Sequence, residues 1–419
     1  MSTGAPPLPG HQIGVAQQRE LSVDGLVPAK IMRPSDSDDA ARGLRQCDEA
    51  GAATIVWGGG TQMALGSVPA RYDIALSTER MTRLLEYEPG DLTCRVEAGM
   101  RVGDLQASLK AKGQRLPLDP PHPTRATAGG MVAANSNGVS RARYGTVRDW
   151  VIGLAVAYPS GKVARAGGKV VKNVAGYDLM KLHTGALGTL GVVTEVNFKL
   201  QTCPEAEVTV LGHFQDPSAG LNAGIELAHQ YLSPAAMILL DRTALWQCGL
   251  TADWRWTLAI KLEGYAQEIE PLRDVAARIV RGAGGRLEGQ AAPEHFWDEA
   301  RDWSAPLDAA DAILYGMTSL TGLRTMLPEI AGQGSLMAHP ASGVFHLRLP
   351  AEAAAPALHR LRQAAGADGQ VIVARAPAAV KRDLDVWGPP PAAVALMRSL
   401  KQALDPNATL SPGRFVGGL

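Results

Sequence analysis

The sequence has no excess of charge of either sign. Its 419 residues include 41 Lys and Arg against 41 Asp and Glu, so the formal net charge is zero. A chain without a basic field has no general attraction for nucleic acid or anionic membrane. It also lacks an apolar run near the ~18 residues of a membrane-spanning helix, and its start, MSTGAPPLPGHQIG, lacks the basic and apolar regions of a signal peptide. These absences favour a globular protein of the cytoplasm.

Cysteine is scarce, and aromatic residues make up only 5% of the chain. The cysteines lie far apart and form no CxxC pair, so this chain alone is not expected to build an iron–sulfur cluster or a structural zinc site. We predict no metal site and four isolated thiols: Cys47, Cys94, Cys203 and Cys248. By contrast, 46 glycines and 28 prolines predict many turns and loops, where functional sites often lie.

The length and the 46% hydrophobic content fit a globular protein of two domains. Residues 20–202 alternate short strands with short helices. A helix is expected from about residue 37, because acidic residues open it and Gly51 follows it. A strand ends at Trp57 before three glycines, and LAVAYPSGKVARA (154–166) is typical of a hairpin.

After residue 204 the glycine loops become rare, and the pattern becomes strand, helix, strand, strand, helix. This order is typical of a ferredoxin-like layer. The segments concerned are AEVTVLGHF, GLNAGIELAHQYL, AAMILLD, WTLAIKLEG and QEIEPLRDVAARIVRGAGG. A second, weaker round is expected over 311–375, with GVFHLRL and QVIVARA as strands. The final stretch, LDPNATLSPGRFVGGL, is not amphipathic and is interpreted as a strap over another domain.

The stretch IVWGGGTQM (55–63) has the form of a strand that ends in a loop with a bare backbone. A Walker A loop would need Gly-Lys-Ser/Thr after the glycines, which this loop does not supply. A Rossmann loop would open a long helix, whereas Pro69 follows here too soon. The GxxGxxG stretch at 185–191 precedes a strand rather than a helix. Each loop alone is a weak signal.

Five stretches taken together and in order are more informative. They are IVWGGGTQ (55–62), LDPPHPTRATAGGMVAANSNG (118–138), RYGTVRDWVIG (143–153), KVVKNVAGYDLMKLHTGALGTLGVVTE (169–195) and LDPNATLSPGRF (404–415). This set resembles the FAD-linked oxidases of the vanillyl-alcohol oxidase / p-cresol methylhydroxylase superfamily. Within it, the set is similar to the family of FAD-binding second subunits, or E subunits, of bacterial glycolate oxidase. KNVAGYDLMKL is its most specific part, and over 204–400 the resemblance rests only on order and class.

The resemblance implies an α+β fold, with a two-part FAD-binding domain of the p-cresol methylhydroxylase (PCMH) type and a ferredoxin-like α+β cap domain. We expect a flexible tail at 1–19, the FAD-binding domain at 20–203 and the cap at 204–400. A strap at 401–419 is expected to return to the FAD-binding domain.

FAD is the implied cofactor. A pyrophosphate carries two negative charges, and the bare backbone of Gly58, Gly59 and Gly60 can approach it closely. The segment Thr127 to Gly130 is expected to open a short helix whose N-terminal amides face the cofactor. The residues expected to bind FAD are Val56, Trp57, Gly58, Gly59, Gly60, Thr61, Gln62, Asp119, Pro120, Thr127, Gly129, Gly130, Ala133, Asn135, Gly138, Tyr144, Gly145, Asp149, Gly188, Thr189, Gly191, Val192 and Val193.

Some of these roles come only from the resemblance. Tyr144 matches a tyrosine near the flavin, and Asp149 matches an acid that fixes its loop. Two positions depart from the family pattern: Leu187 stands where catalytic members usually carry Glu, and Ser411 stands where Asn is usual. No histidine follows Gly60, where relatives with a covalent flavin attach it. Non-covalent FAD is therefore expected.

Oxidation of a 2-hydroxy acid needs a base for the hydroxyl proton and a cation or metal for the carboxylate. Catalytic relatives carry a metal-binding stretch of the form His-x-Gly-Asp-Gly-Asn-x-His in the cap, and this sequence lacks it. The nearest stretch is HPASGVFHLRLP (339–350). The catalytic residues stay unknown. The candidates are His183 in a flavin motif, His346 and Arg348 on one strand face, and Arg301 beside Trp297 on a helix face.

Two main hypotheses follow. In the first, the chain is the FAD-binding subunit of a glycolate oxidase complex, with a catalytic flavin subunit and an iron–sulfur subunit as partners. It would then lie in the cytoplasm, or at the inner face of the membrane through the complex. In the second, it is a self-sufficient FAD-dependent dehydrogenase of a small 2-hydroxy acid such as D-lactate, with His183 or His346 as base. A scaffold that has lost FAD is a third reading, which the intact loop glycines disfavour.

Overall fold

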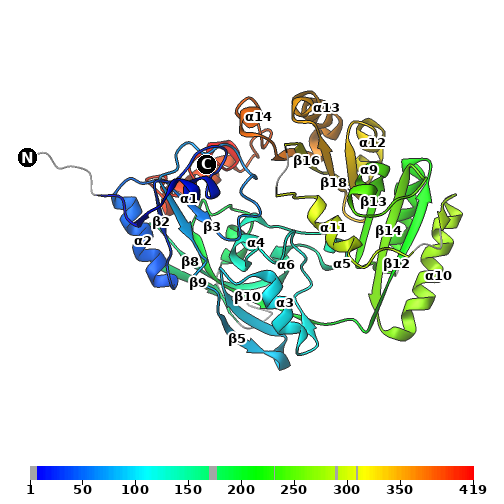
Figure 1. Ribbon diagram of the computed structural model, residues 1–419, viewed down its shortest axis with the longest axis horizontal. Coiled ribbons are helices and arrows are strands. Elements are labelled where there is room, and N and C mark those ends of the chain that lie inside the picture. Colours follow the sequence, from blue (N-terminus) through cyan, green and yellow to red (C-terminus); the bar gives the residue numbers. More distant parts are fainter. Residues whose placement is uncertain (1–6, 169–176, 231, 288–290, 308–309) are drawn as a thin grey trace, which may run out of the picture.

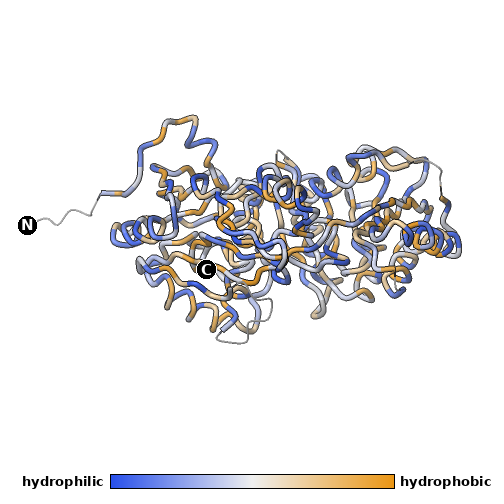
Figure 2. Tube along the Cα trace, turned by 90° about the horizontal axis from the view of Figure 1, so that it is seen from below, coloured by the Kyte–Doolittle hydropathy of each residue, from blue (hydrophilic) through white to orange (hydrophobic). Residues whose placement is uncertain are grey.

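The computed structural model describes residues 7–168, 177–230, 232–287, 291–307 and 310–419. Two halves lie side by side in Figure 1, and the C-terminal segment (red) returns to the half that holds the N-terminal strands (blue). This first half contains a four-stranded, a five-stranded and a two-stranded sheet, whereas the second half contains one eight-stranded sheet. Hydrophobic segments run through both halves (Figure 2). The fold is the α+β arrangement that the sequence predicts.

The four-stranded sheet has the order β1 (His11–Gln12), β2 (Lys30–Met32), β4 (Ile74–Ser77) and β3 (Thr54–Trp57). Its inner strand β4 runs parallel to β2 and β3, and β1 pairs antiparallel with β2. Helix α1 (Val15–Glu20) follows β1.

The prediction of a flexible tail over residues 1–19 is therefore wrong from His11 onward. The pair of strands β1 and β2 holds this segment by backbone hydrogen bonds. Strand β1 is two exposed polar residues long, so it carries no apolar alternation that could reveal it in the sequence.

The five-stranded sheet is antiparallel throughout. Its order is β5 (Leu84–Glu88), β6 (Thr93–Glu97), β10 (Val192–Lys199), β8 (Val151–Ala157) and β9 (Val163–Gly167). Strands β8 and β9 form the predicted hairpin, and its turn includes Gly161 at a φ of 79°. The short strands β7 (Gln114–Arg115) and β11 (Gln201–Thr202) form the third sheet.

Helix α2 (Ser37–Glu49) joins the two larger sheets of this half. The Asp36 side chain accepts a hydrogen bond from Asp39 N (2.8 Å) and caps the helix, as the acidic opening predicts. Its buried face packs in one cluster with residues of β4, β8 and β10. The remaining helices of this half are α3 (Val102–Lys110), α4 (Ala128–Ala134), α5 (Arg141–Tyr144), α6 (Val147–Trp150), α7 (Leu179–His183) and α15 (Val394–Leu404).

The eight-stranded sheet of the cap combines two βαββαβ units. The first contains β12 (Ala206–Phe214), α8 (Pro217–His229), β13 (Ala236–Asp241), α9 (Arg242–Gln247), β14 (Trp256–Gly264), α10 (Ala266–Gly282) and β15 (Arg286–Leu287). After α11 (Phe296–Trp303), the second contains β16 (Ala312–Met317), α12 (Leu320–Ile330), β17 (Ser335–His339), β18 (Val344–Leu349), α13 (Ala354–Ala365) and β19 (Gln370–Arg375).

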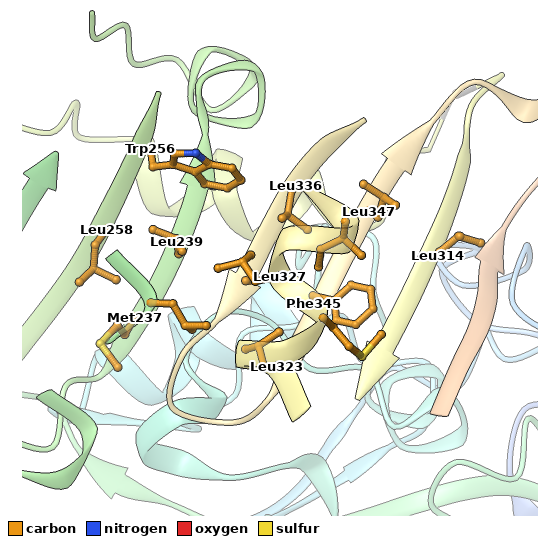
Figure 3. Close-up of a cluster of buried hydrophobic side chains, with 14 of the residues drawn as sticks. Met237, Leu239, Trp256, Leu258, Leu314, Leu323, Leu327, Leu336, Phe345 and Leu347 are labelled. Atoms are coloured by element: carbon orange, nitrogen blue, oxygen red, sulfur yellow. The ribbon is translucent and has the colours of Figure 1, made fainter. Parts of the chain in front are cut away.

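The strand order, β15-β12-β14-β13-β17-β18-β16-β19, places two ferredoxin-like units edge to edge. They join at the antiparallel pair of β13 and β17, where Leu239 lies opposite Ala338. The side chains of Leu239 and Leu336 lie on the same side of this join, and Leu323 and Leu327 of α12 lie over it (Figure 3). The shared core explains why the two units form one sheet.

The second unit is more complete than the sequence indicated. Strands β18 and β19 are predicted from the sequence, whereas β16 and β17 are not. All five residues of β17, SLMAH, are buried. A strand that is covered on both faces loses the alternation of apolar and polar residues by which strands are recognised.

The C-terminal strap follows α15 and lies beside strand β3. Thr54 N donates to Thr409 O (2.7 Å), and Ser411 N donates to Thr54 O (2.9 Å). Lys401 ties the start of the strap to the segment before β10, because its Nζ donates to Asp405 Oδ2 (2.5 Å) and to Thr189 O (2.8 Å). The strap therefore closes against the strand that leads into the triple glycine.

Candidate functional site

A pocket with an empty volume of about 720 Å³ opens where the triple-glycine loop, helix α4, the segment after α7 and the strap meet. The predicted FAD-binding residues that line it are Val56, Gly58, Gly59, Gly60, Thr61, Gln62, Thr127, Gly129, Gly130, Ala133, Gly188, Gly191, Val192 and Val193. Most of the predicted set thus meets around one cavity.

The glycines of the loop are required by close packing against the chain before α4. A Cβ on Gly59 would lie 1.7 Å from Arg125 O, and a Cβ on Gly58 would lie 2.3 Å from Thr127 Oγ1. Gly60 has a φ of 73°, which disfavours other residues. The absence of side chains therefore allows the loop to pack closely against residues 125–127 of the same chain. It also leaves the backbone of the loop accessible to a ligand in the pocket.

The backbone amides of the loop are available for a ligand. Among the described residues, none accepts a hydrogen bond from the N–H groups of Gly59, Gly60, Thr61 or Gln62. Unpaired amides gathered in a concave loop are suited to an anion such as a pyrophosphate. These donors are the feature of the pocket that fits FAD best.

The amides at the start of α4, in contrast, are already used. Ala128 N donates to Met100 O (2.8 Å), Gly129 N to Ala98 O (2.8 Å) and Gly130 N to Thr127 Oγ1 (3.2 Å). The prediction that the N-terminal amides of this helix face the cofactor is therefore wrong. Thr127 caps the helix, and only the surfaces of Gly129 and Gly130 contribute to the pocket wall.

Several other residues of the predicted set do not line this pocket. They are Trp57, Asp119, Pro120, Asn135, Gly138, Tyr144, Gly145, Asp149 and Thr189. Trp57 donates from Nε1 to Tyr72 Oη (2.6 Å), and Asp119 accepts from Ser140 N (3.0 Å). Asp149 accepts from Thr146 N (2.8 Å) and so fixes its own loop, which is the role that the resemblance implies. Residues 172–176 of the KNVAGYDLMKL motif lie outside the described residues.

Tyr144 joins the two domains instead of facing the pocket. Its hydroxyl donates to Glu263 Oε1 of β14, and Arg115 donates to both carboxylate oxygens of Glu263 (2.6 and 3.1 Å). Glu263 is only 4% exposed. Burial raises the pKa of the Glu263 carboxyl, but the hydrogen bonds from Arg115 and Tyr144 outweigh burial and hold that pKa below its ordinary value.

The catalytic candidate His183 lies in the core, away from the pocket. It is 2% exposed, and its Nε2 lies 2.8 Å from Tyr158 Oη. Burial lowers the pKa of His183 to about 4, so the ring is neutral near pH 7. It is not among the residues that line the pocket.

His183 should make stability depend on pH. Its pKa rises to its ordinary value, ~6.5, on unfolding. The unfolded chain therefore binds more protons between about pH 4 and 6.5, and acidification through this range should lower the free energy of unfolding by up to about 3 kcal/mol. Urea unfolding of His183→Gln should lose this part of the pH dependence. The exposed His229→Gln is the control, and an unchanged pH profile in both variants would contradict the prediction.

Arg301 and Arg348 also lie outside the pocket and have protein partners. Arg301 donates to Asp298 (2.6 Å) and Asp302 (2.7 Å), and Arg348 donates to Asp311 (2.8 Å). His346 and Arg348 lie on the same strand, β18 (Val344–Leu349), and none of the four catalytic candidates lines the pocket. The described residues include no group of three or more His, Cys, Asp or Glu arranged to hold a metal ion.

His346 belongs to a buried cluster on the cap sheet. Its ring lies 5.6 Å from that of His339 and 5.1 Å from that of Tyr315, and Tyr315 Oη accepts from Arg141 of α5 (3.1 Å). Burial and the nearby Arg141 lower the pKa of His346 to about 3. Both nitrogens of His339 and Nδ1 of His346 lack hydrogen-bond partners within the described part of the chain. Such unsatisfied buried groups often mark a site for water or a ligand.

Five residues outside the predicted FAD-binding set also line the pocket: Met63, Thr78, Ala134, Leu187 and Arg414. Three of them flank predicted residues and could have been included by adjacency. Arg414 lies in the stretch LDPNATLSPGRF (404–415), whose place in the flavin set was a signal for it, whereas only proximity in the fold identifies Thr78.

The fold and pocket together define a FAD-binding domain with an antiparallel cap. Residues 28–167 match the family described as FAD binding domain, and residues 389–415 match the C-terminal domain of FAD linked oxidases. The chain thus carries the FAD-binding domain of the FAD-linked oxidases.

Individual relatives are similar at modest identity. The glycolate oxidase subunit GlcD of Bacillus subtilis is 32% identical over 58% of this chain and 53% of its own length. A D-lactate dehydrogenase of Archaeoglobus fulgidus is 33% identical over 51% and 48%. The glycolate oxidase subunit GlcE of Escherichia coli is 29% identical over 80% and 85%. The matched region spans about half the length of the first two relatives.

A solved structure of p-cresol methylhydroxylase with substrate bound has the same fold. It superposes with a TM-score of 0.69 at 15% identity, over 93% of this chain and 88% of that one. At this identity the comparison speaks for the fold alone. No helix within the described ranges is long and apolar enough to cross a membrane.

Proposed function

We propose that this protein binds FAD non-covalently and serves as the FAD-binding subunit of a glycolate oxidase complex. In that complex glycolate is oxidised to glyoxylate, and its two electrons pass to an iron–sulfur partner subunit while two protons are released. The catalytic flavin subunit is the second partner. FAD, when bound, supplies a redox centre that can accept and pass on electrons.

The four unpaired amides from Gly59 to Gln62, at the wall of the 720 Å³ pocket, carry this proposal. They offer several hydrogen-bond donors to one pyrophosphate. None of the described lining residues is His, Cys or Tyr, the side chains that could attach a flavin covalently. The pocket chemistry thus supports non-covalent FAD.

The role of a subunit is favoured because the catalytic candidates are dispersed. His183 is in the core, whereas Arg301 and Arg348 are bound to neighbouring carboxylates. His346 lies on the cap sheet, and none of these four candidates is among the described residues that line the pocket, so none of them is placed as a base beside the cofactor. Similarity to two glycolate oxidase subunits supports the choice of complex.

An anaerobic absorbance experiment tests the proposal. The purified chain, loaded with FAD, should show a flavin spectrum that glycolate does not bleach, because none of the catalytic candidates lines the described wall of the pocket. Coexpression with the catalytic and iron–sulfur subunits should yield a complex whose flavin is bleached by glycolate. Rapid bleaching of the isolated chain by glycolate would contradict the proposed role, as would its failure to enter the complex.

A self-sufficient dehydrogenase of a small 2-hydroxy acid such as D-lactate is the second candidate. The cluster of His339 and His346 favours it, because three ring nitrogens there lack partners and Arg141 lies close by. In this case D-lactate should bleach the isolated chain, and His346→Gln should slow the bleaching at least about tenfold. The surface variant His229→Gln serves as control. Bleaching that is equally fast in both variants would remove His346 as base.

A further inference from the structure

Arg414 in the strap is a buried cation at the wall of the pocket. It is 4% exposed, and its Nη2 donates to Met63 O (2.7 Å) and to Leu65 O, both in the loop that follows the triple glycine. Its Nε is buried and has no hydrogen-bond partner among the described residues. The main chain around it is held firmly, because Ser67 N and Trp387 Nε1 both donate to Arg414 O (3.0 Å each).

The charge of Arg414 is not balanced by a carboxylate in the pocket. None of the described lining residues is Asp or Glu, and Arg414 is the one charged residue among them. The acid that influences it most, Asp24, bonds to Lys381 Nζ (2.5 Å), and Lys381 also donates to Ala64 O (3.0 Å). Two cations thus share one carboxylate beside the loop.

A buried charge without a counter-charge is unfavourable, and a guanidinium does not escape by losing its proton. An anion in the pocket would relieve this cost. In oxidised FAD the pyrophosphate carries the negative charges, and the free amides of residues 59–62 lie just before the carbonyls that Arg414 binds. Arg414 and the residues that carry these amides line the same cavity.

From this geometry, and resting on the proposed FAD binding, we infer that Arg414 is a cationic contact for the pyrophosphate of FAD. The strap therefore supplies part of the cofactor site, in addition to covering strand β3. A charge-assisted hydrogen bond of this kind is expected to change affinity by about 10- to 100-fold.

Fluorescence titration of the apoprotein with FAD and with riboflavin, which has no phosphate, tests the inference. Arg414→Met should weaken FAD binding about 10- to 100-fold and riboflavin binding less than about threefold. Arg414→Lys keeps the charge and should retain intermediate affinity for FAD. Arg398→Met, on the exposed side of α15, is the control and should bind FAD as the wild type does.

Equal weakening of FAD and riboflavin would show a merely structural role and overturn the inference, as would unchanged FAD binding. Circular dichroism of each apoprotein identifies a variant that fails to fold. If Arg414→Met does not fold, the FAD and riboflavin affinities of Arg414→Lys test the inference instead. If riboflavin binds too weakly to measure, the salt dependence of FAD binding is compared, and it should be shallower in Arg414→Met than in the wild type. Equal salt dependence would overturn the inference.

The inference and the proposed function can fail separately. A wild-type chain that binds FAD but does not support glycolate oxidation in the complex would refute the proposed function. The role of Arg414 would still be tested by the two titrations, because they require only flavin binding.

Discussion

The variant Gly59→Ala is expected to lose FAD binding. The new Cβ would lie 1.7 Å from Arg125 O and 2.5 Å from Arg125 C, so the loop or the chain before α4 must move. Both contacts are with backbone, which cannot turn aside as a flexible side chain can. Overpacking of this kind costs ~1–3 kcal/mol and sometimes more. We expect a loss of at least about 2 kcal/mol in the free energy of unfolding and at least about 100-fold weaker FAD binding, because the amides of the loop are displaced.

Urea unfolding of the apoprotein and fluorescence titration with FAD measure these two effects. Gly90→Ala is the matched control, because a Cβ at that exposed position meets nothing within 4 Å. It should leave stability and FAD binding unchanged. If Gly59→Ala bound FAD as tightly as Gly90→Ala does, the loop would not be the site of the pyrophosphate.

The variant Glu263→Gln is expected to destabilise the junction of the two domains. Glu263 is 4% exposed and accepts hydrogen bonds from Arg115 and Tyr144. Loss of the Glu263 charge leaves Arg115, whose side chain is 22% exposed, without its counter-ion. The cost should be about 2 kcal/mol, below the ~3–5 kcal/mol that is typical for a fully buried pair. The exposed Glu207, which pairs with Lys261 (2.9 Å), is the control, and Glu207→Gln should cost ~0–1 kcal/mol.

The pH dependence of this effect has a defined sign. The pKa of Glu263 is lowered in the folded protein, so the pair stabilises the fold above the ordinary carboxyl pKa of ~4.3. This stabilisation is lost as the pH falls through the lowered pKa of the folded state. Wild type and Glu263→Gln should therefore differ in free energy of unfolding at pH 7 and converge in acid. A constant difference across this range would contradict the assignment.

The identity of the domain and the main wall of the pocket could be predicted from sequence. The loops that hold Gly58 to Gln62 and Gly188 to Val193 are continuous stretches, so the residues that share the pocket within each loop are also neighbours in the chain. The hairpin of β8 and β9 was predictable for the same reason, because a turn with Gly161 fixes it locally. Local patterns of this kind survive in the sequence without knowledge of the fold.

The sequence predicted less reliably what individual residues do when this depends on the direction of a side chain or an amide. Tyr144 lies in a flavin-domain motif, but its hydroxyl reaches Glu263, which is 119 residues further along the chain. The amides of Gly129 and Gly130 lie at the pocket, but Ala98 and Thr127 already accept their hydrogen bonds. A sequence motif indicates which residues lie near a site. Their hydrogen-bond partners, however, depend on which other segments of the chain pack against the motif.

The sequence by itself determined the α+β class, the FAD-binding domain and the glycines of its loop, since each rests on local spacing and composition. Only the tertiary structure showed that two ferredoxin-like units share one sheet, that the catalytic candidates lie apart and that Arg414 reaches the pocket. These facts depend on contacts between residues that are hundreds of positions apart, such as Arg414 with Met63. The sequence predicted that the strap returns to the FAD-binding domain, but only the packing of the strap against strand β3 shows which side chain of the strap reaches the pocket.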